Sequence, residues 1–545
     1  MKRFFENNIV VKWILYAMLI LLSVLNFLHW ANMKDVYYAD EVYTYESVNG
    51  FEQEWPRAIL DEWMGSERIV SYLAADVDTP GYVQISTVLY GDHVPLFFWM
   101  TRFISLHFFK HQASIWICLS SNLVFYLILI SLLYFIFCKI SSKPFVSFVV
   151  VAVSMLYNRT VLEQTTMLRM YIMMLMLIAM LLALGLYIFQ TAEKGKIAWI
   201  GLILLTPVSL AGLLTHYDFW IYYALTAFCI CLYSLILAIK KEKKKFYKTG
   251  YFKNIIGWCI SFAISLGATI KLFPYCVWNL HKDKGWAALT SVSSISNSKF
   301  ENIVWGFKTL AKSFFSSTPA VIGLIIVFGV LAGAIYISIK TKNRKQLINL
   351  SFPIVISFLY QIAVCFTLPA AREERYIWCS NTILYLCFAY SIYIILDYIY
   401  GLLKDKKYQK LVISCASFVI ISPLVFAQYC EINHGKGITY LFFEGKDTQA
   451  LKDHSDIPWV VYGPCEAHSF FDFVYSSEIC FMTNTACEAD YVAAEHLNDT
   501  DTFLIYAYES QVSDAEVFFE DALNTDLTVT YLTASTNFNV YLVSK

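Results

Sequence analysis

Two adjacent carboxylates, Asp40 and Glu41, stand in the stretch YYADEVYTYE, shortly after a long apolar run. A carboxylate placed among tyrosines, where water is scarce, is suited to take a proton from a hydroxyl group as a general base. Side chains of neighbouring residues point in different directions on a regular element, so only one of the two can face a substrate. Spacing alone does not decide which one, and both acids could instead cap a helix that begins near Tyr43.

Further polar residues with useful chemistry lie near the ends of other apolar runs. Charges at membrane depth are costly and therefore mark functional sites by default. Arginine binds phosphate through two parallel hydrogen bonds and stays charged, whereas histidine and aspartate can share a divalent cation. The alternative is that these residues only mark the membrane interfaces, together with tyrosine and tryptophan anchors. They are Asp92, His93, Arg169, His216, Asp218, Lys271, Arg372 and Arg375.

The elements that must position these residues are apolar segments. The chain has 545 residues, of which 58% are hydrophobic and 15% charged, so its composition is that of a membrane protein. A helix needs about 20 apolar residues to cross a bilayer. The segments of this kind lie at about 10–30, 113–137, 145–157, 166–189, 197–214, 217–239, 254–275, 319–339, 348–368, 376–399 and 411–428. We therefore expect a polytopic α-helical membrane protein with about eleven transmembrane helices.

Basic residues set the expected orientation. The segments MKRFFENNIVVK, KISSK, EKGK, KKEKKKFYK, KTKNRK and KDKKYQK all fall on one side if every segment crosses in turn. Lys and Arg favour the cytoplasmic side, so this pattern predicts a multi-pass plasma-membrane protein with a cytoplasmic N-terminus. The first apolar segment is too long for a signal peptide and is expected to remain as an anchor. The large first loop, about 31–112, and a second loop, about 276–318, would then be extracytoplasmic.

The tail after residue 430 differs in composition from the rest. Residues 431–545 hold 19 acidic residues and 4 lysines, whereas residues 1–430 hold 37 basic and 23 acidic residues. The runs WVVYG, EICFMT, TFLIYAY, LTVTYL and FNVYLVS are typical of strands, and helical stretches separate them. The tail is therefore expected to be a small extracytoplasmic α/β domain that follows a transmembrane domain at 1–430.

Several short motifs occur in the order found in a known family. The stretches ADEVYT, DHVPLFF, LRMY, THYDFW and REERYIW extend over residues 35–378. Together they resemble the GT-C superfamily of integral-membrane glycosyltransferases, close to the protein O-mannosyltransferase and aminoarabinose-transferase branch. Val94 stands where the family usually has a first proline, and Met167 stands where it often has an acid.

The resemblance implies roles for individual residues. Asp40 occupies the position of the family's catalytic acid and would be the general base, with Glu41 as the neighbour that sets its electrostatics or bonds to the loop. Asp92 and His93 would order the outer loop and orient the acceptor or hold a divalent metal ion, the one cofactor considered; a capped turn before an interfacial helix at Pro95 is the alternative. The residues that the resemblance assigns to substrate binding are Asp92, His93, Arg169, Tyr171, His216, Tyr217, Arg372, Arg375 and Tyr376.

The implied reaction is transfer of a hexose or pentose from a polyprenyl-phosphate donor to an extracytoplasmic glycan, lipid or protein acceptor, with inversion. Such a donor stays in the lipid bilayer and requires no nucleotide site, which agrees with the lack of a glycine-rich phosphate loop, and no nucleic acid partner is expected. A flippase or transporter of a lipid-linked glycan is one alternative. A non-catalytic membrane protein whose acidic tail binds a partner is another.

Overall fold

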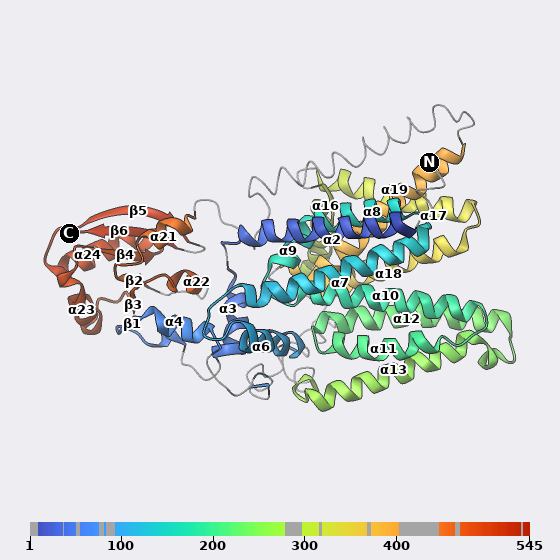
Figure 1. Ribbon diagram of the computed structural model, residues 1–545, viewed down its shortest axis with the longest axis horizontal. Helices are drawn as coiled ribbons and strands as arrows, with labels where there is room; N and C mark the ends of the chain where they lie inside the picture. Colours follow the sequence, from blue (N-terminus) through green and yellow to red (C-terminus); the bar gives the residue numbers. More distant parts are fainter. Residues whose placement is uncertain are drawn as a thin grey trace.

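The structure is a computed structural model of the chain, and it combines a long helical bundle with a small sheet domain at one end (Figure 1). The described residues are 9–35, 37–50, 55–75, 81–82, 85, 93–277, 297–315, 319–367, 372–402, 446–463, 469–535 and 538–545. The first of these segments starts at the end of the bundle far from the sheet, whereas the C-terminus lies within the sheet domain.

Eight helices among the described residues are long and apolar enough to cross a membrane. They are α2 (Ile9–Asn32), α7 (Trp116–Ser141), α10 (Tyr171–Glu193), α12 (Tyr217–Lys241), α13 (Gly250–Leu272), α17 (Ala320–Lys340), α18 (Arg344–Thr367) and α19 (Trp378–Leu402), the last joined to the short helix η4 (Glu374–Ile377). The pair α8 (Pro144–Leu156) and α9 (Arg159–Thr166) passes the same test with a bend of 63° between them, and α11 (Trp199–Leu213) is a shorter apolar helix.

These helices confirm the expected polytopic α-helical class. The predicted segment 411–428 lies outside the described residues, so the count of eleven stays a prediction. Helix α10 is the most enclosed of the eight, with 72% of its most apolar window buried, whereas α2, α13 and α17 present most of their apolar side chains outward. Helices that expose apolar side chains in this way are suited to a lipid environment.

The first outer loop folds into short elements between α2 and α7. They are α3 (Ala39–Tyr45), η1 (Glu46–Gly50), η2 (Pro56–Ala58), β1 (Trp63–Gly65), α4 (Ser66–Leu73) and α6 (Leu96–Phe108). Helix α6 begins after Pro95 and is two-sided, because it buries Phe97 and Phe98 and exposes Phe103 and Phe108. Part of the second predicted loop is also helical, since α16 (Asn297–Phe315) packs against α17 and α18.

The C-terminal domain is built on a six-stranded sheet with the order β1-β3-β2-β4-β6-β5. The five predicted strand-like runs are β2 (Trp459–Tyr462), β3 (Glu478–Met482), β4 (Thr502–Ala507), β5 (Thr528–Ala534) and β6 (Asn539–Ser544). Strand β2 runs parallel to β3 and β4, whereas β6 is antiparallel to β4 and β5. The sixth strand was not expected, because β1 comes from the first outer loop and pairs antiparallel with β3.

Both faces of this sheet are covered. Helices α23 (Glu488–Glu495) and α24 (Val512–Leu523) pack on the face that presents Val460 and Tyr462. Trp459 and Val461 point to the opposite face and join the hydrophobic core that continues into the helical bundle, through the short helix α22 (Phe470–Phe473). A fourth helix, α21 (Thr448–Asp453), precedes β2. The sheet domain and the bundle therefore share one core.

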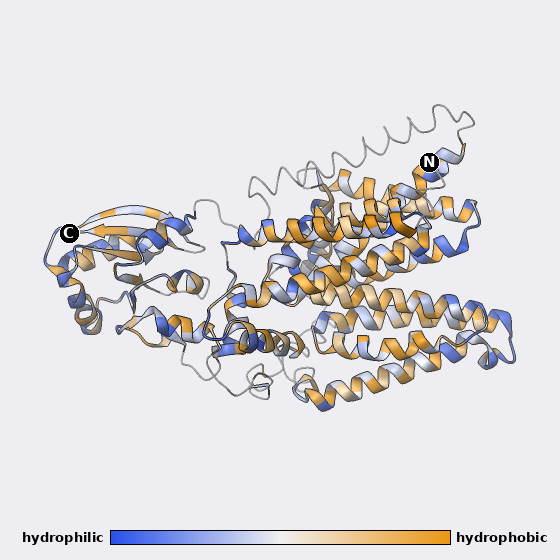
Figure 2. Cartoon of the chain, viewed as in Figure 1, coloured by the Kyte–Doolittle hydropathy of each residue, from blue (hydrophilic) through white to orange (hydrophobic). Residues whose placement is uncertain are grey.

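Polar residues collect at the end of the bundle opposite the sheet domain (Figure 2). The connections from α12 to α13 and from α17 to α18 lie there, and both are lysine-rich in the sequence. This gathering of basic connections at one end agrees with the expected alternate crossing. The assignment of that end to the cytoplasm remains a prediction.

Candidate active site

Asp40 is the second residue of α3, at the end of the bundle that faces the sheet domain. Its side chain is 26% exposed. The Nη1 atom of Arg375 donates a hydrogen bond to its Oδ2, and the Nη2 atom of Arg169 lies 3.9 Å from the same oxygen. Three segments far apart in the sequence thus bring one carboxylate and two guanidinium groups together. The carboxylate is partly open to solvent, whereas both guanidinium groups are buried.

Arg169 lies in the four-residue break between α9 and α10, where the backbone leaves the helical path. Its Nη1 donates to the backbone oxygen of Asp40 and to Oγ1 of Thr44, both at 3.0 Å. The amide of Asn122 on α7 donates to the carbonyl of Met167 at 2.7 Å and holds this break in place. Because its side chain is only 2% exposed, Arg169 is a buried cation fixed by direct contacts.

Glu41 points away from Asp40 and is fully buried. Its Oε1 accepts a hydrogen bond from the backbone N–H of Leu168 at 2.6 Å, and its Oε2 accepts one from the N–H of Tyr38 at 2.8 Å. The ammonium group of Lys34 lies 3.0 Å from Oε1 and compensates its charge. Glu41 therefore ties the start of α3 to the residue before Arg169, a position that suits orientation of Asp40 rather than contact with a substrate.

Arg375 lies in η4, just before α19, and its side chain is 7% exposed. Besides Asp40, its guanidinium faces the carboxylate of Glu373 and lies 5.1 Å from the ring centroid of Tyr38 and 5.3 Å from that of Tyr376. The hydroxyl of Tyr360 donates to the Tyr376 carbonyl at 2.9 Å, which anchors η4 on α18. Burial raises the pKa of Glu373 above its usual value.

Arg372 contacts different partners. Its Nε donates to Asn302 at 3.0 Å and its Nη2 to Glu301 at 3.0 Å, both on α16, and its side chain is 39% exposed. Of the two arginines predicted in this motif, Arg375 is the one that contacts Asp40. Lys271 is exposed at the end of α13, and Asp92 lies outside the described residues.

His93 joins the cluster from the outer loop. Its Nε2 lies 3.2 Å from Nη2 of Arg169, and its ring stacks on Phe98 at 5.9 Å between centroids. A ring nitrogen that accepts a hydrogen bond from a guanidinium offers no lone pair to a metal ion. This contact favours the loop-ordering role over the metal-binding role considered for His93.

His216, Tyr217 and Tyr171 come from the starts of α12 and α10. The His216 side chain caps α12 by accepting a hydrogen bond from the N–H of Asp218 at 3.1 Å, and its ring lies 5.7 Å from that of Tyr171. Tyr217 packs instead against an apolar cluster that contains Val94. His216 and Tyr171 therefore support the cluster around Asp40 from behind, whereas Tyr217 supports the outer loop.

Sequence reasoning missed two charged residues of the cluster, Lys34 and Glu373. Lys34 follows the first apolar segment on the predicted outer side, where the charge bias disfavours lysine, and this anomaly was a usable signal. Glu373 stands among four consecutive charged residues in REER, so its motif gave no reason to select it. Neither pairing could be read from spacing, because both depend on how the outer loop folds.

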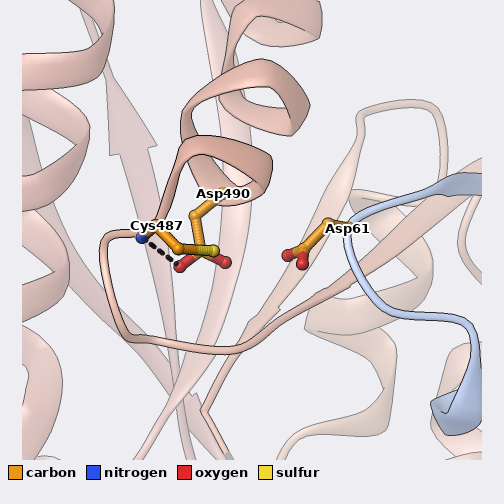
Figure 3. A group of neighbouring side chains, drawn as sticks. All are labelled: Asp61, Cys487 and Asp490. Carbon is orange, nitrogen blue, oxygen red and sulfur yellow. Dashed lines mark hydrogen bonds between the residues drawn. The ribbon is translucent and has the colours of Figure 1, made fainter.

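A separate group of ligand-type atoms lies in the sheet domain (Figure 3). One atom each of Asp61, Cys487 and Asp490 lies within 4.8 Å of the others. The Asp490 carboxylate already accepts hydrogen bonds from the backbone N–H groups of Thr483 at 3.0 Å and of Thr485 and Cys487 at 3.2 Å, and from the Thr483 hydroxyl at 2.8 Å. Its position is explained by capping of the turn that leads into α23, so we assign no metal to this group.

Comparison with known proteins gives structural neighbours only. No family model and no curated protein matches the chain. ArnT from Cupriavidus metallidurans, an aminoarabinose transferase, is 9% identical with a TM-score of 0.49 in the apo state and 0.46 bound to undecaprenyl phosphate, over 97–98% of both chains. AglB from Archaeoglobus fulgidus, an oligosaccharyltransferase solved with an inhibitory peptide and a dolichol-phosphate, is 9% identical with a TM-score of 0.46, over 94% of this chain and 71% of that chain. Both have the GT-C fold that the motifs resemble. Because these scores are below 0.5, we rest no functional conclusion on them.

Proposed function

We propose that this protein is a membrane glycosyltransferase that moves a sugar from a polyprenyl-phosphate donor to an extracytoplasmic acceptor with inversion. The observation that carries the proposal is the partly exposed Asp40 carboxylate between the guanidinium groups of Arg169 and Arg375. A general base and an anion-binding pair are the two parts that this reaction needs. Their place at one end of a bundle of apolar helices suits a donor whose lipid stays in the bilayer.

The arginines supply the electrostatic part. As the bond between the anomeric carbon and the phosphate oxygen breaks, the electron pair goes to the oxygen and negative charge grows on the phosphate. Two buried guanidinium groups stabilise that charge more strongly in the transition state than in the ground state, and this lowers the barrier. Contacts with Thr44, Tyr38 and Tyr376 hold Arg169 and Arg375 beside Asp40.

Asp40 supplies the base. The acceptor hydroxyl attacks the anomeric carbon from the face opposite the phosphate, and its proton goes to the Asp40 carboxylate. Proton transfer to a positioned carboxylate contributes about 10²–10⁴-fold to a rate. In the structure Asp40 is paired with Arg375, so the donor phosphate must draw the guanidinium groups toward itself before Asp40 can accept a proton. This competition makes the base available when the leaving group is bound.

Binding of undecaprenyl phosphate to the purified full-length protein tests the anion-binding part. Native mass spectrometry should detect a complex that is at least tenfold weaker in Arg375→Lys. Undecaprenol lacks the phosphate, so its affinity for the wild-type protein should be no higher than its affinity for Arg375→Lys. Equal binding of the alcohol and the phosphate would remove the arginines from the donor site.

Transfer itself is tested with a lipid extract from cells that lack the gene, in which the donor should accumulate. Addition of the purified protein and a surface-glycan fraction from those cells should release polyprenyl phosphate, measured by mass spectrometry. Donor that accumulates on the cytoplasmic leaflet, with no release by the protein, would instead support the flippase alternative. The sugar and the acceptor follow from the masses of the consumed lipid and the modified product.

A further inference from the structure

The C-terminal domain contacts the segment that carries Asp40 through a buried lysine. Lys446 lies just before α21, and its ammonium group lies 2.9 and 3.0 Å from the two carboxylate oxygens of Asp472. The same group donates a hydrogen bond to the backbone oxygen of Asp35, five residues before Asp40. The side chains of this ion pair are 0% and 2% exposed, so both charges are held away from water.

Tyr37 connects this pair to a second one. The Lys446 ammonium lies 5.6 Å from the centroid of the Tyr37 ring, and the Lys34 ammonium lies 5.4 Å from it. Lys34 in turn pairs with Glu41, which is bonded to the start of α3. Two cations thus share one aromatic ring, an arrangement in which each contact depends on the position of that ring.

An aromatic contact supports the same segment from the side. The ring of Phe471, next to Asp472 on α22, lies 4.5 Å from the ring of Tyr37 and 5.1 Å from that of Tyr45. Tyr37 and Tyr45 lie on either side of Asp40 in the sequence. The sheet domain therefore holds the chain both before and after the proposed base.

A buried ion pair is weak evidence for stability, because a well-packed apolar replacement of both partners is often neutral or stabilising. The pair of Lys446 and Asp472 instead fixes an orientation. Two carboxylate oxygens and the Asp35 carbonyl hold the ammonium group in one position. The hydroxyl of Ser535 donates to Asp472 at 3.2 Å and fixes the carboxylate as well. Because all its contacts are made, the Lys446 ammonium group can fix the segment before Asp40 relative to the sheet domain.

We propose that the C-terminal domain sets the position of Asp40, with Lys446 and Asp472 as positioning residues. The inference rests on the proposed role of Asp40 as the base. It assigns to the acidic tail a part in the transfer step that requires no contact between the tail and either substrate.

The test replaces both charges in the full-length protein. Lys446→Met/Asp472→Leu removes the ion pair without leaving a buried charge, so we expect an unfolding temperature close to that of the wild type. With Asp35 and Tyr37 released, hydrogen exchange of the amides in 37–46 should become at least fivefold faster. The maximal rate of polyprenyl phosphate release should fall at least tenfold, while the half-saturating amount of lipid extract stays within twofold.

Glu478→Gln is the matched control. It removes a charge from an exposed pair with His496 in the same domain, and it should leave the exchange rate and the transfer rate unchanged.

If the double variant does not fold, Lys446→Arg keeps the charge but not the shape of the ammonium group. It should lower the maximal rate and speed exchange in 37–46, and wild-type values in both measurements would overturn the inference.

The outcomes separate the two proposals. A double variant that keeps the wild-type rate and wild-type exchange in 37–46 shows that the pair serves only to hold the domain, which overturns the inference. Faster exchange together with an unchanged maximal rate overturns it too. If the wild-type protein releases no polyprenyl phosphate, the proposed glycosyltransferase activity fails, and the inference fails with it even if the exchange data still show that the two domains are coupled.

Discussion

At the scale of single residues, the central feature is a carboxylate that is neutralised by two arginines. In the structure the Asp40 carboxylate accepts a hydrogen bond from Arg375, and the guanidinium group of Arg169 lies 3.9 Å from the same oxygen. A donor phosphate that attracts the same guanidinium groups would draw them away from the Asp40 carboxylate and leave it free to meet the acceptor hydroxyl. Binding of the donor and activation of the acceptor are therefore coupled through shared arginines.

Replacement of Asp40 by Asn should abolish transfer and preserve donor binding. We expect the release of polyprenyl phosphate to fall by at least about 10²-fold, the usual contribution of a general base. Undecaprenyl phosphate should bind at least as tightly as it does to the wild type, because the phosphate no longer competes with a carboxylate. A variant that retains more than a tenth of the wild-type rate would move the base elsewhere, with Glu373 as the nearest candidate.

Replacement of Arg169 by Lys should remove most activity at normal expression. Lysine keeps the charge, but it cannot reach the Asp40 carbonyl, Thr44 and His93 at once, and it cannot bind phosphate in a bidentate manner. We expect a loss of about ten- to a hundredfold, or roughly 1.4–2.7 kcal/mol, in the rate at low donor concentration. Arg372→Lys is the matched control and should keep near-wild-type activity, since its partners are on α16. Equal losses in the two variants would contradict the assignment.

At the scale of elements, Glu41 joins α3 to the break between α9 and α10. Its carboxylate accepts hydrogen bonds from the backbone N–H groups of Tyr38 and Leu168. The positions of the neighbouring Asp40 and Arg169 therefore depend on the same side chain. The two acids were predictable as a pair, and the different directions of adjacent side chains predicted that only one of them faces a substrate. The choice of Asp40 came from the family resemblance and stays a prediction. Lys34 was not assigned, because its contact with Glu41 joins the segment after α2 to α3 and cannot be read from either segment alone.

Lys34→Met should therefore destabilise the protein more than the double variant Lys34→Met/Glu41→Gln does. The single variant leaves Glu41 as a buried charge without its counter-ion, a change that typically costs about 3–5 kcal/mol. The double variant leaves no charge, although one of the two backbone N–H groups then faces the side-chain amide nitrogen, which cannot accept a hydrogen bond. Thermal unfolding followed by tryptophan fluorescence measures both, and an equal loss in the two variants would show that the ion pair is not the cause.

The stability of the folded state around β1 should depend on pH. Burial, together with the neighbouring Asp490, raises the pKa of Asp61 to about 6, from 3.8 in its ordinary state. Between these two pH values the folded state keeps a proton on Asp61 that the unfolded state loses. The contribution of Asp61 to the stability of the folded state is therefore full below about pH 4 and is lost as the pH rises through about 6. Asp490 stays charged, because burial is outweighed by hydrogen bonds from Asp61 and Thr483 that lower its pKa.

We expect Asp61→Asn to raise the unfolding temperature at pH 7.5 and to leave it nearly unchanged at pH 4. Asparagine resembles the protonated acid, so it removes the repulsion at neutral pH and makes little difference where the proton is already bound. Glu62→Gln changes an exposed acid in the next position and should have no such pH-dependent effect. A stabilisation of the same size at both pH values would rule out the titration of Asp61 as the cause.

At the scale of the whole molecule, apolar length and the alternation of the tail were enough to predict the helical bundle and five strands. Strand β1 was beyond sequence reasoning, because its three residues carry no periodic pattern and their partner lies in another domain. Helix α16 was missed for a different reason, because its mixed composition resembled a polar loop. A segment such as β1, which is stabilised by a distant partner rather than by its own pattern, is not predictable from the sequence.

A reporter that is active only in the cytoplasm tests the predicted topology. Fused after Lys545, it should be silent, whereas a fusion within the connection between α12 and α13 should be active. Both expectations follow from the lysine-rich connections at the end of the bundle opposite the sheet. Strong activity of the C-terminal fusion would place the sheet domain, and Asp40 with it, on the cytoplasmic side.

The pairing of β1 with β3 also has a consequence for the order of folding. The indole N–H of Trp63 donates to the carbonyl of Ala493, 430 residues later, so the first outer loop cannot complete its structure until the ribosome has nearly finished the chain. Contacts of such long sequence separation form slowly. The segment around Asp40 is thus expected to be among the last parts to become protected, so that chains stopped before the sheet insert into the membrane with an unfinished site.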